Sequence, residues 1–436
     1  MLSTIIWNRL SPVEQVALLQ RPTQNNQGEL LSKVQKIIQS VQIEGDNALR
    51  EMTMQYDCVQ INEFKVSSDA FIQARSAVKD STVKALERAI AQLSAFHSKQ
   101  KTADLCVETS PGIMCQRQSR PIQRVGLYIP AGSAPLVSTV LMLGVPAKIA
   151  GNPLRILCTP PRLDGTVDPA ILVAAQLCGI EHVYRVGGAQ AIAAMAYGTQ
   201  SIPKVDKIFG PGNAWVTQAK ICVSQEVDGA IYDLPAGPSE VLVIADETAN
   251  PAFVAADLLS QAEHGADSQV LLLCTNRSLI DNIRVAIEEQ IATLSRKHIA
   301  MQALENSRLI YVADLKEAFS ISNEYAPEHL ILQIKNPNAY IQDIKCAGSV
   351  FLGPWSPESA GDYASGTNHV LPTYGFAKKL SGLSINDFMT YITFQELTQE
   401  GLADIAPTIA ELTGIEGLDG HQRAIDIRLE ASRTRS

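Results

Sequence analysis

The spacing of hydrophobic residues divides the chain into a helical first quarter and a longer region in which apolar runs alternate with helical segments. Residues 29–56, 67–77 and 79–100 carry apolar side chains three and four positions apart, which predicts amphipathic helices. A shorter helix is expected just before them, because Ser11, Pro12 and Glu14 form the pattern of a capping box with proline at the first helical position.

From about residue 110 the pattern changes to short apolar runs separated by helical segments. This alternation is typical of a parallel sheet with helical crossovers, and it occurs twice in succession. We therefore predict an α/β fold of two related, incomplete Rossmann-like parallel-sheet domains, with small N- and C-terminal helical extensions. The expected strands are 124–129, 154–159, 182–186 and 207–209, then 241–245, 269–274, 309–312, 330–334 and 349–352. The expected helices lie near 135–150, 167–178, 188–197 and 213–226, then 251–264, 277–294, 314–325 and 336–345.

The pattern breaks at residue 353, and residues 353–384 hold many Gly, Pro and Ser without a clear period. The tail from Asn386 is expected to be helical, with Phe388, Ile392 and Leu397 as its apolar stripe. The predicted boundaries are an N-terminal helical extension, a first α/β domain in two pieces, a second α/β domain between them, and a C-terminal helical tail. In that order they span residues 1–27, 28–127 with 240–383, 128–239, and 384–436.

Composition and charge narrow the class of protein. A chain of 436 residues with 46% hydrophobic and 19% charged residues is globular, and its net charge of -9 argues against nucleic acid or an anionic membrane as a partner. No apolar run approaches the roughly 20 residues that a membrane span needs. The eight cysteines are scattered without a CxxC pair, so we expect buried, reduced thiols in a soluble cytoplasmic protein.

Glycine-rich segments follow several predicted strands. Glycine lets a backbone approach a ligand closely, and a following helix offers free N–H groups to phosphate. In parallel sheets ligands bind beyond the carboxyl ends of the strands, so these loops predict a ligand crevice. Tight turns alone also require glycine, and no GxGxxG is present, so a dinucleotide is one candidate among phosphorylated ligands. The four segments are Gly126–Ser133, Val186–Gln190, Phe209–Asn213 and Leu234–Ser239.

The helix end at residues 258–265 carries candidate metal ligands. Gln261 and His264 are three residues apart and share one helix face, and Gly265 ends the helix. Such residues also occur at solvated helix ends, where a histidine complements the helix dipole. Asp362 and the distant His421 would complete a nitrogen and oxygen set suited to zinc or a similar divalent ion. A solvated histidine is the ordinary alternative for His421.

Glu328 and His329 are adjacent and directly precede a predicted strand. A carboxylate and an imidazole at the rim of a crevice suit general acid–base catalysis near neutral pH. The alternative is a turn led by Pro327 with two solvated side chains. His369 ends a long irregular segment, 356–369, that is rich in side-chain donors, and such a segment is uncommon in a compact domain unless it lines a site.

These stretches, in this order, resemble the histidinol dehydrogenase family over nearly the whole chain. The likeness is densest in 125–133, 186–193, 205–214, 233–245, 257–265, 327–330 and 349–374. It implies a zinc-dependent, NAD-linked four-electron oxidation of L-histidinol to L-histidine through L-histidinaldehyde, the last steps of histidine biosynthesis. Two NAD would be reduced in turn and one water consumed. The alternatives are a related dehydrogenase of another small polar alcohol, a zinc hydrolase that does not use NAD, and a non-catalytic nucleotide-binding module.

The resemblance also implies roles for individual residues. It implies one zinc per subunit, held by Gln261, His264, Asp362 and the His421 of the other subunit in a homodimer. Glu328 and His329 would be the catalytic pair, with His329 taking the alcohol proton and Glu328 activating water. The first α/β domain would hold zinc and the catalytic pair, the second would bind NAD, and the tail would pack on the partner subunit. Substrate would be bound by Ser239, Gln261, His264, Glu328, Asp362, His369, Glu416 and His421, and NAD by Tyr128, Gln190 and Asn213.

Overall fold

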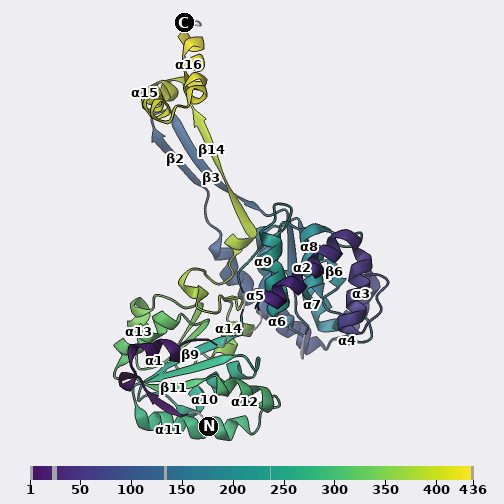
Figure 1. Ribbon diagram of the computed structural model, residues 1–436, viewed down its shortest axis with the longest axis vertical. Coiled ribbons are helices and arrows are strands. Elements are labelled where there is room, and N and C mark those ends of the chain that lie inside the picture. Colours follow the sequence, from purple (N-terminus) through teal and green to yellow (C-terminus); the bar gives the residue numbers. More distant parts are fainter. Residues whose placement is uncertain (1–2, 22–26, 132–134, 236, 434–436) are drawn as a thin grey trace. The chain divides into compact units, whose positions relative to one another are not determined.

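The computed structural model describes residues 3–21, 27–131, 135–235 and 237–433. The chain forms two compact units, each built from segments that are distant in sequence. Unit 1 comprises residues 1–100 and 122–388, and unit 2 comprises residues 101–121 and 389–436 (Figure 1). Unit 1 contains two parallel sheets, as the strand and helix alternation predicts, whereas the sheet of unit 2 is antiparallel.

The first parallel sheet, here sheet B, has the strand order β6-β5-β4-β7-β8 in the described chain. Its strands are β4 (Arg124–Tyr128), β5 (Leu154–Thr159), β6 (His182–Arg185), β7 (Lys207–Phe209) and β8 (Ile231–Tyr232). The crossover helices are α6 (Val137–Ala150), α7 (Pro169–Leu177), α8 (Gly188–Tyr197) and α9 (Ala214–Ser224). The expected strands and helices of this region are confirmed to within a few residues, apart from the short strand β8, which the apolar pattern did not predict.

The N-terminal helices cover sheet B. They are α2 (Gln27–Glu44), α3 (Asp46–Asp57), α4 (Ser68–Ala77) and α5 (Asp80–His97). Val34 and Leu49 belong to one buried cluster with Ile156 and Ile192. This packing differs from the predicted grouping of residues 28–127 with 240–383, because the apolar stripes of α2 and α3 meet α8 and not the second sheet. The expected helix over 29–56 is broken at Gly45, whose φ of +58° is unfavourable for other residues.

The second parallel sheet, sheet A, has the order β1-β11-β10-β9-β12-β13 among the described residues. Its strands are β1 (Thr4–Ile6), β9 (Glu240–Ala245), β10 (Gln269–Cys274), β11 (Arg308–Tyr311), β12 (His329–Gln333) and β13 (Ser349–Leu352). Its helices are α10 (Pro251–Ala262), α11 (Arg277–Ile291), α12 (Lys297–Glu305), α13 (Leu315–Tyr325) and α14 (Glu358–Tyr363). The helix expected at 336–345 is a 3₁₀ helix over Pro337–Asp343.

The first residues of the chain belong to sheet A. Strand β1 pairs with β11 at its edge, where only helix was expected. The predicted capping box is confirmed: Ser11 caps helix α1 (Pro12–Leu18), and its backbone N–H donates to the Glu14 carboxylate. Residues 3–21 are therefore part of the domain formed by 240–383, while residues 22–26 of the predicted extension lie outside the described residues.

Unit 2 corrects the prediction of a wholly helical tail. Residues Met389–Leu397 form strand β14, which pairs along its whole length with β3 (Ile113–Pro121), itself paired with β2 (Leu105–Ser110). Residues 390–394 are all β-branched or aromatic, which favours a strand, and the helical stripe was the wrong interpretation. Helices α15 (Gln399–Glu416) and α16 (Asp419–Arg433) complete the unit.

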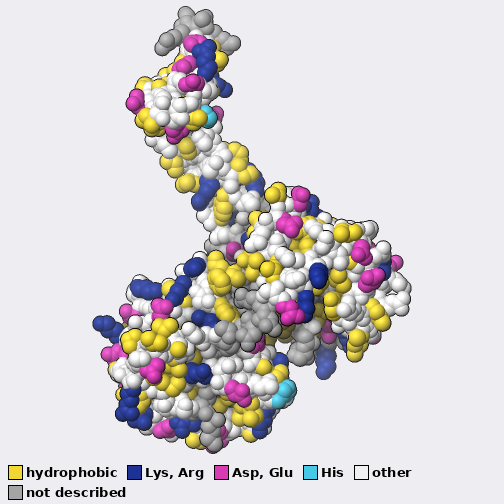
Figure 2. Space-filling model, in the orientation of Figure 1, with side chains coloured by type: hydrophobic (Ala, Val, Ile, Leu, Met, Phe, Trp, Pro, Cys, Tyr) yellow, Lys and Arg dark blue, Asp and Glu magenta, His cyan; other side chains and the backbone are white. Residues whose placement is uncertain are grey.

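Unit 2 exposes many large apolar side chains. Figure 2 shows hydrophobic side chains along this unit, and the exposed ones include Leu105, Val107, Tyr391, Ile392, Phe394, Leu412, Ile415 and Leu418. Isolated apolar residues on a surface are ordinary, but a contiguous set marks a surface that is covered by another molecule.

All eight cysteines lie in the described residues and are free thiols. Cys158 and Cys274 are buried as expected, whereas Cys58 and Cys106 are exposed. Across the described ranges, none of the helices combines the length and the apolar character needed to cross a membrane.

Candidate active site

A cavity of about 180 Å³ in unit 1 collects most of the side chains that the sequence singled out. Sheet B contributes the carboxyl ends of its strands, through residues that follow β4, β7 and β8. Sheet A contributes the amino ends, because Ser239 directly precedes β9 and His329 is the first residue of β12. The predicted residues that line the cavity are Ser239, Gln261, His264, Glu328, His329, Asp362 and His369.

The backbone of Glu240 holds both Glu328 and His329. Its N–H donates to Glu328 Oε2 at 2.8 Å, and its carbonyl oxygen lies 3.1 Å from His329 Nδ1. Because a carbonyl oxygen can only accept, Nδ1 carries a hydrogen in either protonation state of the ring, so Nε2 is the atom that gains or loses the second proton. Among the described residues Nε2 has no hydrogen-bond partner although it is buried; Asp362 Oδ1 lies 3.7 Å away.

Three carboxyl groups surround the imidazole of His329. Glu328 Oε2 and Glu358 Oε1 lie 3.6 and 4.0 Å from Nδ1, and Asp362 faces Nε2. Burial raises the pKa of Glu328 and of Glu358 to about 8, although His329 opposes both shifts. Burial alone would lower the pKa of His329, but the carboxylates, Glu358 foremost, outweigh it and raise that pKa well above the ordinary value.

Asp362 behaves differently from the other two carboxyl groups. Burial would raise its pKa, but the neighbouring imidazole of His329, together with His369 and His264, lowers it. His329, Glu358 and Asp362 place ligand atoms within 4.8 Å of one another, so that these residues could hold a metal ion. Asp362 is thus an ionised carboxylate among imidazoles, which is the state that a divalent cation prefers in its ligand.

Gln261 and His264 lie at the C-terminal end of helix α10, and one polar atom of each side chain is already hydrogen-bonded. His264 Nδ1 lies 2.9 Å from the Ser260 carbonyl oxygen, so it carries the hydrogen and leaves Nε2 as an acceptor. The Gln261 side chain is buried, and its amide nitrogen donates to the Glu358 carboxylate. Its carbonyl oxygen Oε1 is then left as an acceptor.

The other predicted substrate residues fall in two places. His369 Nδ1 lies 3.0 Å from the Asp362 carbonyl oxygen and Nε2 lies 3.3 Å from Thr139 Oγ1, so this ring joins α14 to α6. Glu416 and His421 are not among the residues that line the cavity. They belong to unit 2, as the last residue of α15 and the first turn of α16, and both are exposed.

The predicted NAD residues lie at the carboxyl ends of sheet B and already make bonds of their own. The Tyr128 hydroxyl accepts from the Gly188 N–H at 3.0 Å, and Asn213 Oδ1 caps α9 by accepting from Trp215 and Val216. Gln190 is buried in the first turn of α8. Of the glycine-rich segments, Gly132, Ser133 and Ala236 lie outside the described residues.

Glu358 is the residue of this site that the sequence reasoning missed. Its signal was present, because Glu358 and Asp362 are four apart at the start of a helix and therefore share a face. Residues 353–384 have no clear hydrophobic period, and this short helix lies within them, so the sequence predicted no helix there.

Two parallel-sheet lobes around a cavity lined by buried imidazole and carboxyl groups are the arrangement of an α/β enzyme with a confined site. A family model for histidinol dehydrogenase matches residues 19–429. The histidinol dehydrogenase of Colwellia psychrerythraea is 53% identical over 426 residues, which are 98% of each chain. That of Yersinia pestis is 53% identical over 427 residues, covering 98% of this chain and 96% of the relative. The crystal structure of histidinol dehydrogenase from Elizabethkingia anophelis superposes with a TM-score of 0.95 at 47% identity, covering 99% of both chains.

The chain therefore belongs to the histidinol dehydrogenase family, a family of oxidoreductases.

Proposed function

We propose that the chain oxidises L-histidinol to L-histidine through L-histidinaldehyde, with zinc bound in the cavity and two NAD reduced in turn. The observation that carries this proposal is the cavity itself, which joins the acid–base pair Glu328 and His329 to the oxygen and nitrogen ligands of α10 and α14. In this reading the family membership supplies the substrate, and the geometry supplies the groups that its oxidation requires.

In the alcohol step His329 accepts the hydroxyl proton. Its Nδ1–H is fixed on the Glu240 carbonyl, so Nε2 of the deprotonated ring is the atom that takes the proton as hydride passes to NAD. The buried cluster keeps bulk water away from the reacting carbon.

In the aldehyde step Glu328 activates the water that is consumed. A buried carboxylate whose pKa is raised to about 8 is a stronger base than an ordinary glutamate, so it can take a proton from water as the oxygen attacks the aldehyde. The second hydride then leaves for a second NAD, and His329 can again accept the proton released.

Zinc fits the cavity through Gln261 Oε1, His264 Nε2 and Asp362, because the remaining polar atoms of the first two side chains are already engaged. His421 of the partner subunit would be the fourth ligand. When bound, zinc would supply positive charge that holds the imidazole and amine of the substrate and orients its reacting carbon. Ser239, His369 and Glu416 would complete the substrate contacts.

NAD would lie on the carboxyl ends of sheet B, against Tyr128, Gln190 and Asn213. The glycine-rich turns before α8 and α9 allow a close approach of the backbone, and the positive end of each helix dipole favours phosphate, although Asn213 already caps two N–H groups of α9. We also propose a cytoplasmic location, which the free thiols of all eight cysteines support.

Stoichiometric oxidation tests the reaction. Purified protein is incubated with limiting L-histidinol and excess NAD, and NADH is followed by its absorbance. Two NADH per histidinol are expected. A single NADH would mean that the reaction stops at the aldehyde, and no NADH would favour a zinc hydrolase. Faster turnover of another small polar alcohol would favour a different dehydrogenase.

The homodimer is tested by complementation between two inactive variants. The exposed apolar surface of unit 2 supports packing on a partner, which would bring Glu416 and His421 to the neighbouring cavity. If His421 acts in trans, mixing His421→Ala with His264→Ala restores one complete site in each heterodimer, and activity returns. Absence of any recovery would place His421 in its own subunit's site or outside it.

A further inference from the structure

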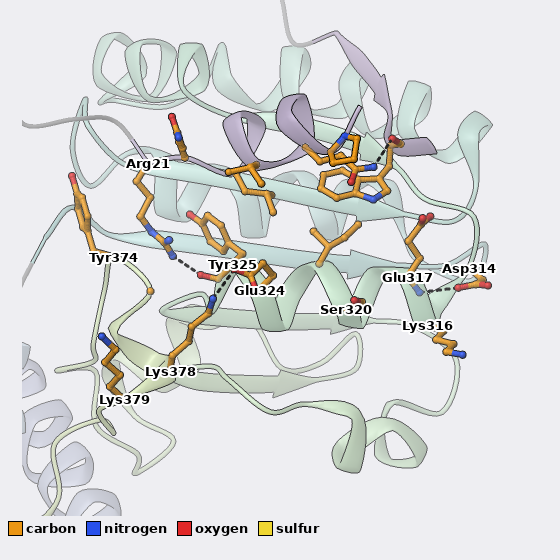
Figure 3. Close-up of a pocket in the computed structure, with 18 residues that line it drawn as sticks. Arg21, Asp314, Lys316, Glu317, Ser320, Glu324, Tyr325, Tyr374, Lys378 and Lys379 are labelled. Carbon is orange, nitrogen blue, oxygen red and sulfur yellow. Dashed lines mark hydrogen bonds and ion pairs between the residues drawn. The ribbon is translucent and has the colours of Figure 1, made fainter. Parts of the chain in front are cut away.

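A half-buried arginine from the start of the chain contacts the residues that hold the acid–base pair. Arg21 lines a groove of about 1040 Å³ between the N-terminal segment and α13, outside the cavity described above (Figure 3). Its side chain is 14% exposed and that of Glu240 only 2%, so their ion pair is shielded from solvent. In Figure 3 Arg21 reaches from the N-terminal segment toward Tyr325.

Arg21 joins two separate segments of the chain through one guanidinium. Nε and Nη2 form a fork on the Glu240 carboxylate, at 2.5 and 2.9 Å. Nη2 also donates to the Tyr325 carbonyl at 2.8 Å and more weakly to that of Ala326, and the guanidinium stacks 4.0 Å from the centre of the Tyr325 ring. A planar fork of this kind fixes both distance and orientation, which a lysine cannot do.

Both of these segments are next to the catalytic pair, one through hydrogen bonds and the other along the chain. Glu240 is the residue whose N–H and carbonyl hold Glu328 and His329. Tyr325 and Ala326 form the turn just before them, and Ala326 adopts a φ of +52°, which is unfavourable for a residue with a side chain. A strained turn persists only when its surroundings hold it, and Arg21 bonds the two carbonyls at this point.

We propose that Arg21, acting through Glu240, is a positioning residue that sets Glu328 and His329 for proton transfer. The ion pair of Arg21 with Glu240 holds the start of β9 against the turn before β12. The Glu240 N–H therefore stays on Glu328, and the Glu240 carbonyl keeps the hydrogen of His329 on Nδ1. This inference rests on the proposed function for its kinetic readout. Its structural readout, the contact between Glu240 and Glu328, does not depend on the substrate.

The kinetic experiment uses full-length Arg21→Met, Arg21→Lys and Glu240→Gln. Arg21→Met is expected to lower kcat for aldehyde oxidation by roughly tenfold to a hundredfold, with KM changed less than about twofold, because substrate contacts remain. Arg21→Lys restores the charge without the fork and should recover only part of that loss. Glu240→Gln keeps the shape of the side chain but removes the charge that pairs with Arg21, and it should show a smaller loss of the same kind even if Arg21→Met fails to fold. Lys378→Met is the matched control: Lys378 lines the same groove but pairs with the exposed Glu324, so its kcat should not change.

A double mutant separates positioning from general destabilisation. In a Glu328→Gln background the base is already lost, so adding Arg21→Met should lower aldehyde oxidation by less than about twofold. The same full loss in both backgrounds would overturn the proposal.

Crystal structures of the unaltered protein and of Glu240→Gln and Arg21→Met supply the independent test. The proposal expects the 2.8 Å contact between Glu240 N and Glu328 Oε2 to lengthen beyond hydrogen-bond distance in the variants. An unchanged contact would overturn it. If the unaltered protein gives no NADH from histidinol, the proposed function fails, and these structures still decide the role of Arg21.

Discussion

The two parallel sheets of unit 1 supply opposite ends and opposite chemistry to one cavity. Sheet B presents the carboxyl ends of its strands, where the loops are glycine-rich and the available groups are mostly backbone N–H. Sheet A presents the amino ends of β9 and β12, where Glu328, His329 and the backbone of Glu240 meet. Asp233 and Leu234 follow β8 and Ser239 precedes β9, and all three line the cavity, so this part of the chain contributes to both rims.

The rule that ligands bind at the carboxyl ends of parallel strands holds for sheet B but not for sheet A. Ligands of parallel sheets bind beyond the carboxyl ends because glycine turns and helix N-termini gather there. The amino ends of sheet A instead receive the C-terminal end of α10, which delivers Gln261 and His264. We expect the sheet A rim to govern chemical steps and the sheet B rim to govern the affinity for NAD.

The largest effect is expected at Glu328. Glu328→Gln keeps the size of the side chain but removes the base, so aldehyde oxidation should fall by about 10²- to 10⁴-fold, the usual contribution of general base catalysis. Alcohol oxidation should fall much less, because only the second half-reaction needs an activated water. The two half-reactions are assayed separately, and equal losses would contradict this role.

The next effect concerns zinc at the same rim. His264→Ala removes one of the proposed zinc ligands and should cost roughly 10-fold or more in zinc affinity, a typical change even for residues that only support a ligand. Zinc content is measured after dialysis against a chelator that the unaltered protein withstands. Glu263→Ala is the matched control, since Glu263 follows α10 but does not line the cavity. Equal zinc retention in both variants would exclude His264 as a ligand.

A smaller effect is expected at the sheet B rim. Gly188 has a φ of +68°, and a Cβ there would lie 2.6 Å from Gln190 Oε1. Gly188→Ala should therefore displace Gln190 and raise KM for NAD several-fold, with kcat within about twofold. Gly151→Ala is the control, because Gly151 also has a positive φ but has open space around it. A change in kcat without a change in KM would contradict the division between the rims.

The smallest effect is expected on stability, at a carboxyl group of α3 beside sheet B that, unlike those of sheet A, has no charged partner in the described part of the chain. Burial raises the pKa of Asp57 to about 6, and among the described residues its Oδ2 has no hydrogen-bond partner. Because this pKa is raised on folding from 3.8, the carboxyl group favours the folded state only at low pH, and that contribution is lost as the pH rises through 6.

Asp57→Asn is therefore expected to raise the melting temperature at pH 8 by a few degrees, and the gain should vanish near pH 4. Glu51→Gln, on an exposed position of the same helix, is the control for loss of a charge. A gain that persists unchanged at pH 4 would point to a cause other than ionisation.

The sequence predicted the parts of the fold that depend on local pattern. Strands such as 269–274 and helices such as 188–197 were found almost to the residue, because their apolar periods and flanking turns are local signals. The partners of these elements were less predictable. The apolar stripes of α2 and α3 predict helices but not the sheet against which those helices pack. Strand β1 has three residues, too few to show a period.

The site followed the same division. The residue types at Gln261, His264, Glu328 and Asp362 drew attention because they are polar side chains at the ends of apolar elements. Their convergence depends on sheet order, which the periodicity did not give. Arg21 and Glu240 could not be found, since their importance lies in contacts made across more than 200 residues of sequence.

The antiparallel pairing of β3 with β14 has a consequence for how the chain folds. The two strands are separated by residues 122–388, so their union would close a very long loop at a high entropic cost if unit 1 were unfolded. Unit 1 removes that cost, because the Ile122 N–H donates to the Phe388 carbonyl and Asn152 binds the carbonyls of both. Pairing can then proceed from these stems like a hairpin. Unit 2 is thus expected to form after unit 1, because β14 is synthesised after every strand of the two parallel sheets.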